Sequence, residues 1–110
     1  MIRVREVTIE GATFSIASMS VSEAEKFVAE GNEFLKQARA GELKAEDWLG
    51  RRDRAIIASI KKAVPDSDIT IEKLKSEFDL VVFEQLFSAI LAHSGLKPGE
   101  VTATLSPSEK

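Results

Sequence analysis

Residues 2–18 alternate apolar and polar side chains with the two-residue period of a β-strand. The apolar positions fall in two runs, first Ile2, Val4, Val7 and Ile9, then Ala12, Phe14 and Ile16. Glu10 and Gly11 lie between the runs and predict a tight turn, so we expect a β-hairpin over 2–18. The first run slips by one position at Arg5 and Glu6, which predicts a bulge in that strand.

Helical spacing replaces this alternation after Ser20. Apolar residues then recur at steps of three and four, which predicts a helix over 21–40: Ala24, Phe27, Val28, Gly31, Leu35 and Ala38. Two overlapping capping boxes begin at Ser20 and at Ser22, and the sequence leaves the choice between them open. Gly41 should end the helix, because glycine enters the left-handed conformation without steric cost.

Three more helices are predicted further along the chain. The first covers 47–63, ends before Pro65 and has an inner face of four residues: Leu49, Ile56, Ile60 and Val64. Thr70 is the expected N-cap of a short helix over 70–76, and the last helix covers 79–94. Residues 97–110 lose the helical period and gain Pro, Gly and Ser, so we expect a flexible C-terminal tail.

These elements predict an α+β, mainly α fold, with an N-terminal β-hairpin followed by three to four helices in a small orthogonal bundle. A chain of 110 residues is long enough for one globular domain, expected over 1–96. The net charge of −3 gives no general attraction to nucleic acid or to an anionic membrane. The chain has no cysteine, and no apolar run approaches the roughly 18 residues of a membrane span. We therefore expect a soluble, intracellular protein.

The last predicted helix is apolar on nearly every side. Val82, Leu86 and Ile90 form one apolar stripe, and a second consists of Phe83, Phe87 and Leu91. Because a small domain supplies a single core, the second stripe is a candidate surface for a partner chain or for self-association. The equally weighted alternative is a central helix that the other elements wrap.

The adjacent pair His93 and Ser94 suggests a hydrolase at first sight. Neighbouring helical residues point about 100° apart, however, and the chain has no G-x-S-x-G nucleophile motif. Gly95 and Leu96 instead fit a helix C-terminus. We interpret the pair as a helix end and expect no enzymatic activity.

A calcium loop is suggested by D-S-D-I-T-I-E-K-L-K-S-E, which places Asp66, Asp68, Thr70 and Glu77 at ligand positions. Its sixth position needs glycine for a sharp turn, and Ile71 stands there. Capping of the following helix explains the same polar residues. We expect neither a metal nor a cofactor.

The one basic cluster, G-R-R-D-R over 50–54, lies within the second predicted helix. We expect Arg51 and Arg54 to project outward. Asp53 falls within the apolar arc and should pair with an arginine such as Arg52, or with a group of a neighbouring subunit. Without a glycine-rich loop or an aromatic pair, nucleic-acid binding is not expected. Trp48 is a candidate core or interface anchor.

The order of motifs resembles the tail assembly chaperones of long-tailed (siphovirus-type) bacteriophages. The resemblance rests on R-E-V-T-I-E-G-A-T-F-S-I, on S-V-S-E-A-E, on the helix D-W-L-G-R-R-D-R-A-I-I-A-S-I and on an apolar helix that closes on S-G-L, and it extends to about Glu100. It implies a non-enzymatic chaperone in the host cytoplasm that binds the tape-measure protein and recruits the tail tube protein. It also implies self-association, and in many members a longer frameshifted form.

With the resemblance, the candidate partner or self-association surface comprises Phe83, Phe87, Leu91, Trp48, Arg51 and Arg54. Two alternatives stay open. A structural tail or head–tail connector component would remain in the virion, and a small DNA-binding regulator would use the basic cluster. The regulator ranks last, because the link between the second and third predicted helices is longer than a helix-turn-helix allows.

Overall fold

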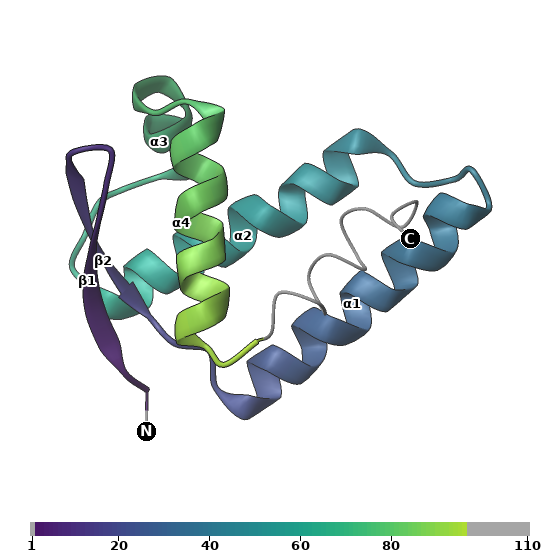
Figure 1. Ribbon diagram of the computed structural model, residues 1–110, viewed down its shortest axis with the longest axis horizontal. Helices are drawn as coiled ribbons and strands as arrows, with labels where there is room; N and C mark the ends of the chain where they lie inside the picture. Colours follow the sequence, from purple (N-terminus) through teal and green to yellow (C-terminus); the bar gives the residue numbers. More distant parts are fainter. Residues whose placement is uncertain (1, 97–110) are drawn as a thin grey trace.

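A computed structural model describes residues 2–96 of the chain. Two antiparallel strands are followed by four helices: β1 (Val4–Ile9), β2 (Ala12–Ala17), α1 (Val21–Arg39), α2 (Ala45–Ala63), α3 (Ile71–Glu77) and α4 (Leu80–His93) (Figure 1). The predicted α+β fold with an N-terminal hairpin is confirmed, and each predicted helix lies within two residues of its observed bounds. The tail predicted for residues 97–110 lies outside the described residues.

The hairpin pairs without interruption from Val4 opposite Ala17 to Ile9 opposite Ala12. The predicted bulge is therefore wrong. Glu10 and Gly11 both adopt positive φ, 51° and 83°, and such a two-residue turn matches the twist of the strands and fixes their register. Since no residue is inserted, Val4 faces away from the core and its side chain is 57% exposed.

Local signals set the ends of the helices. Ser20 is the N-cap of α1, and its side chain and that of Glu23 complete one of the two candidate capping boxes. Thr70 caps α3 as predicted. The helix end at Gly41 is also confirmed, since its φ is +74° and its amide donates to the carbonyl of Ala38.

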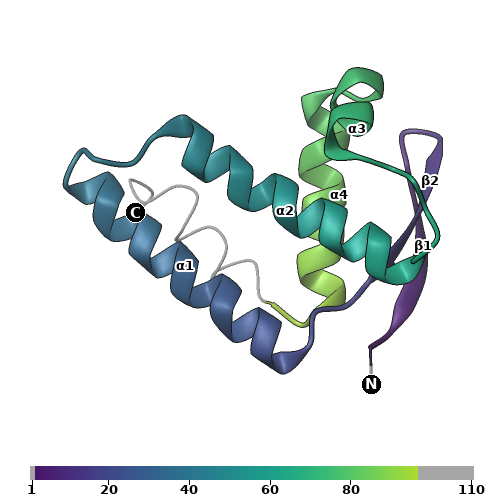
Figure 2. The same cartoon turned by 180° about the vertical axis from the view of Figure 1, so that it is seen from behind.

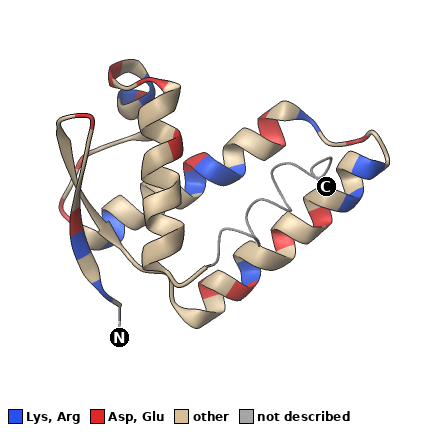
Figure 3. Cartoon of the chain, viewed as in Figure 1, with Lys and Arg blue, Asp and Glu red and all other residues tan. Residues whose placement is uncertain are grey.

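Helix α4 stands at the centre of the fold, with the hairpin on one side and α1 on the other (Figures 1 and 2). It carries few charges over most of its length (Figure 3). Both of its apolar stripes are buried in the core, together with residues of both strands and the other helices: Ile9, Phe14, Ile16, Phe27, Ile56, Ile60, Leu74, Val82, Phe83, Leu86, Phe87, Ile90 and Leu91. The wrapped central helix, one of the two alternatives from the sequence, is the observed arrangement.

The predicted inner face of α2 is right only in its middle. Ile56 and Ile60 are buried, whereas Leu49 and Val64 are 41% and 40% exposed. The helix is longer than the core it covers and runs past α4 in both views (Figures 1 and 2), so the ends of its apolar stripe lie beyond the packed region.

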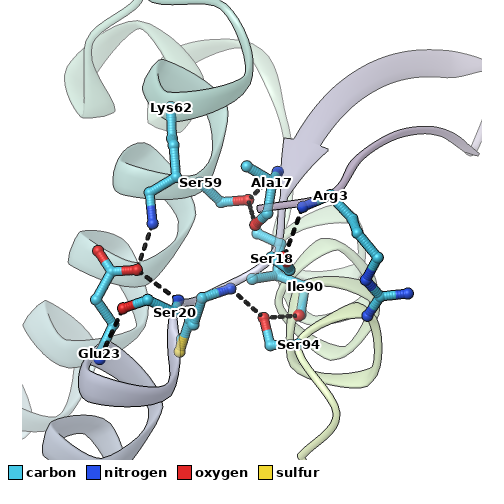
Figure 4. A network of polar contacts seen from close by, with 10 residues as sticks. Arg3, Ala17, Ser18, Ser20, Glu23, Ser59, Lys62, Ile90 and Ser94 are labelled. Carbon is cyan, nitrogen blue, oxygen red and sulfur yellow. Dashed lines mark hydrogen bonds and ion pairs between the residues drawn. The ribbon is translucent and has the colours of Figure 1, made fainter. Parts of the chain in front are cut away.

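Serine hydroxyls join the end of the hairpin to α2 and α4 (Figure 4). Ser59 Oγ of α2 accepts a hydrogen bond from the amide of Ala17 at 2.9 Å and donates one to its carbonyl at 2.8 Å. Ser94 Oγ accepts from the amide of Met19 at 3.0 Å and donates to the carbonyl of Ile90. The Ser59 bonds satisfy the outward-facing backbone groups of Ala17 in β2, and the Ser94 bond ties the link between β2 and α1 to the end of α4.

Candidate functional site

Helix α1 stands apart from the rest of the fold and reaches α2 through long side chains. Glu23 forms an ion pair with Lys62 (Figure 4), and Glu30 Oε2 accepts a hydrogen bond from Arg54 Nη2 at 2.6 Å. Phe27 lies between Glu23 and Glu30 along α1, and Arg51 Cζ of α2 lies 3.6 Å from the centre of its ring. Long side chains thus join the two helices, whose backbones do not pack together closely.

The described residues leave a groove of about 410 Å³ between α1 and α2. Its floor is apolar, with Phe27, Ala55 and Ile90 contributing, and its rim carries charges of both signs. Among residues 2–96 the lining consists of Ala17, Ser18, Met19, Glu23, Lys26, Phe27, Glu30, Arg51, Arg54, Ala55, Ala58, Ser59, Lys62 and Ile90. A concave, mainly apolar surface with a few placed polar groups is typical of a binding site.

Arg51 is the buried cation of this groove, with 3% of its side chain exposed. Its Nη2 donates a hydrogen bond of 2.8 Å to the carbonyl of Phe27. Its Nε is buried and has no hydrogen-bond partner among the described residues, and the nearest carboxylate oxygen, Glu30 Oε1, lies 3.5 Å away. Arg51 therefore keeps one strong donor unused at the edge of the groove.

Burial lowers the pKa of Arg51 to about 10, because desolvation disfavours the charged guanidinium. The nearby carboxylate of Glu30 acts in the opposite direction and raises it, while Arg54 lowers it further. The side chain still carries its positive charge at neutral pH. A charge in such a poorly hydrated place interacts more strongly with an anion than an exposed arginine would.

The other half of the basic cluster faces away from the groove. Arg52 is paired with Asp53 at 3.0 Å and with Glu84 of α4 at 3.1 Å, and Lys75 of α3 lies 3.0 Å from the second Asp53 oxygen. The predicted pairing of the buried Asp53 with Arg52 is confirmed. These residues tie α2 to α3 and α4, so their charges are engaged within the chain.

A second hollow, of about 470 Å³, lies on the opposite flank of α1. Val28 and Ala29 line it from the helix, and Gly95 and Leu96 line it from the turn after α4. The apolar stripe of α1 is consequently divided. Phe27 and Gly31 are buried, whereas Ala24, Val28, Leu35 and Ala38 stay half-buried.

The predicted site residues do not form one surface. Phe83, Phe87 and Leu91 are 3%, 2% and 3% exposed, so their assignment to a partner surface is wrong for the folded chain. Helix α2 covers this stripe through Arg52, which lies over the Phe83 ring, and α1 covers it through Phe27, which packs edge-on against Phe87.

The residues predicted from α2 have mixed outcomes. Arg51 does not project outward as predicted, because it folds back over Phe27 of α1. Arg54 is exposed and lines the groove, and Trp48 is half-buried near the start of α2. Sequence reasoning missed Ala55 and Ala58, which follow Arg51 at steps of four and three. Their helical spacing after Arg51 was the one sign in the sequence that small side chains line the same side of α2 as this arginine and leave room for a groove there.

His93 and Ser94, at the end of α4, have structural roles. His93 Nε2 lies 2.9 Å from the carbonyl of Arg3, and Arg3 Nη2 donates to the carbonyl of His93. Gly95 has a φ of +84°, and the Leu96 amide donates to the Leu91 carbonyl, which confirms the predicted helix end. His93 therefore holds the start of the hairpin against α4, and Ser94 holds Met19, just after the hairpin, through its hydrogen bond.

Two further kinds of feature bear on function, namely metal sites and membrane-spanning helices. Within residues 2–96, no cluster of three or more His, Asp or Glu side chains could hold a metal ion. No helix in that part of the chain is long and apolar enough to cross a membrane. Comparisons of the chain with protein-family models, with curated proteins and with solved structures gave no match.

Proposed function

We propose that this chain is a non-enzymatic phage tail assembly chaperone that binds an apolar helix of the tape-measure protein in the groove between α1 and α2. The observation that carries the proposal is the groove itself. Its floor is apolar, helices form both walls, and its volume of about 410 Å³ accommodates the side chains on one face of a bound helix. Recruitment of the tail tube protein and residence in the host cytoplasm belong to the same proposal and rest on the resemblance.

The proposed binding surface differs from the one expected from the sequence. A chaperone for apolar helices must offer apolar surface in its folded state, and the α4 stripe offers none because it is buried. Phe27 of α1 and the alanines of α2, Ala55 and Ala58, take its place, because they line the groove. Phe83, Phe87 and Leu91 no longer supply a surface for self-association, which stays part of the proposal on the resemblance alone.

Filling the groove tests the proposal without disturbing the core. Ala58 is exposed and lines the groove, so Ala58→Trp adds bulk at the binding site while the fold is retained. Capture of a helical tape-measure fragment by the immobilised chain should weaken at least about tenfold, which corresponds to a loss of roughly 1.4 kcal/mol. Circular dichroism should show unchanged helical content.

Two exposed alanines serve as matched controls. Ala92→Trp places the same bulk on α4, outside both hollows, and Ala29→Trp fills the hollow on the far flank of α1. Both should leave capture within about twofold of the unmodified chain. If Ala29→Trp abolished capture and Ala58→Trp did not, the far flank would be the binding site. If the unmodified chain captured no tape-measure fragment, the proposed function would be wrong.

A further inference from the structure

The groove between α1 and α2 has more positive than negative charge. Of the residues that the structure describes, four cationic side chains line it, Lys26, Arg51, Arg54 and Lys62, and two carboxylates, Glu23 and Glu30. Glu23 is engaged with Lys62 and with the cap of α1. The remaining carboxylate of Glu30 is shared between two guanidinium groups, so the groove is complementary to an additional anion.

Glu30 occupies the place where such an anion would bind. One of its oxygens lies 2.6 Å from Arg54 Nη2, and the other stops 3.5 Å from Arg51 Nε, too far for a hydrogen bond. About a third of its side chain is exposed, so it can turn toward solvent. We propose that Glu30 stands in for a carboxylate of the bound partner, and that this carboxylate, an acidic side chain on an apolar helix, replaces it at Arg51 and Arg54.

The chemistry of the groove favours a carboxylate on an apolar carrier. The Arg51 guanidinium lies over the Phe27 ring, and both residues line the groove together with Ala55, so a ligand that replaces Glu30 at Arg51 must also cover apolar floor. A planar carboxylate can span two arginines as Glu30 does, and charge-assisted hydrogen bonds are stronger than neutral ones. This inference rests on the proposed function, because it specifies the helix that the groove binds: one with an acidic residue within its apolar face.

Decanoate is a suitable probe of the site, because it joins a carboxylate to an apolar chain, and decanamide is its uncharged counterpart. Titration of the full chain, followed by NMR of the backbone amides and of the arginine Nε–Hε groups, should place decanoate at Arg51 and Arg54. Decanamide should bind at least about tenfold more weakly, as expected for loss of a charge-assisted hydrogen bond. Equal affinity for the two probes, or no binding of either, would overturn the site.

Variants of the groove test the role of each charge. Glu30→Gln removes the resident carboxylate and should tighten decanoate binding several-fold, whereas Arg54→Met should weaken it several-fold. Arg39→Met is the matched control, because Arg39 is an exposed arginine of α1 outside the groove lining. Arg51→Met should reduce decanoate binding to the level of decanamide, with circular dichroism reporting whether the fold is kept. Tighter binding by Arg54→Met, or weaker binding by Glu30→Gln, would contradict the replacement of Glu30.

A double-mutant cycle connects the site with the tape-measure protein. Each acidic residue of a captured tape-measure fragment is replaced in turn by its amide, and capture is compared for the unmodified chain and for Arg54→Met. One replacement should weaken capture by the unmodified chain about tenfold and have little effect on the variant. Normal capture without any such coupling would refute the inference and leave the proposed function intact, whereas loss of all capture would refute the function.

Discussion

Replacement of Phe87 by alanine distinguishes a core residue from a surface residue on the apolar helix α4. Phe87 is 2% exposed, and its ring packs edge-on against Phe27 with centroids 5.9 Å apart. Its removal leaves a cavity between α4 and α1 and removes support from the Phe27 ring, on which Arg51 lies. Both the core and one wall of the groove should be weakened.

The expected loss is large compared with the stability of so small a fold. Truncation of a buried phenylalanine costs about 3–5 kcal/mol. At about 0.05–0.15 kcal/mol per residue, a fold of this size has roughly 5–14 kcal/mol in total. Phe87→Ala should therefore lose between about a fifth and all of this stability, and Phe87→Asp, which also buries a charge, should be less stable still.

Urea unfolding followed by far-UV circular dichroism measures this loss directly. With a slope of about 1–3 kcal/mol per molar, the midpoint of Phe87→Ala should fall by at least about 1 M. Val81→Ala is the control on the same helix, because Val81 is 53% exposed and should change stability by less than about 0.5 kcal/mol. A Phe87→Ala protein within about 1 kcal/mol of the unmodified chain would refute the assignment of this stripe to the core.

Three further changes test other parts of the fold, each by urea or thermal unfolding. Ser59→Ala leaves the buried amide and carbonyl of Ala17 without their partner and should lower the free energy of unfolding by about 1–3 kcal/mol. Ser88→Ala, at an exposed position of α4, is the control and should leave stability unchanged. Equal effects of the two changes would contradict the role of Ser59. Glu10→Asn should stabilise the hairpin by up to about 1 kcal/mol, because asparagine tolerates positive φ better than glutamate; a loss of stability would argue against this turn. The hydrogen bond from Lys62 lowers the pKa of Glu23 in the folded chain. Ionised Glu23 therefore stabilises the fold fully above its ordinary pKa of 4.5, and this stabilisation is lost as the pH falls through the lower folded-state pKa. Glu23→Gln should flatten the fall of stability with acid, and an unchanged pH profile would refute this linkage.

Local signals in the sequence were sufficient for the elements and for most of their ends. A threonine N-cap and glycines at positive φ act within a few residues, so Thr70, Gly41 and Gly95 could be recognised from their immediate neighbours. The choice between the two capping boxes at α1 was open because both are compatible with the same helical stripe. It depends on the Met19 amide bond to Ser94, a contact between residues far apart in the chain.

The candidate site could not be predicted in the same way, because it depends on which elements cover each helical face. The period of α4 places Phe83 and Phe87 on a second stripe but does not show that Arg52 and Phe27 cover them. The period of α2 places Arg51 on its outward side, opposite the apolar arc, and does not show that α1 lies within its reach. Whether a helix face is covered by another element or open to a partner can be assigned only when the packing of the helices is known.

The most direct test of the account is a map of the amides that respond to a helical tape-measure fragment, by two-dimensional NMR of the labelled chain. If the fragment binds in the groove, the largest chemical-shift changes should follow its lining, at Lys26, Phe27 and Glu30 of α1 and at Arg54 and Ala58 of α2. Amides beside the exposed Leu80 and Val81 at the start of α4 should not respond. Changes confined to α4 and the hairpin, with the groove silent at saturating fragment, would contradict the claim that this protein binds its partner between α1 and α2.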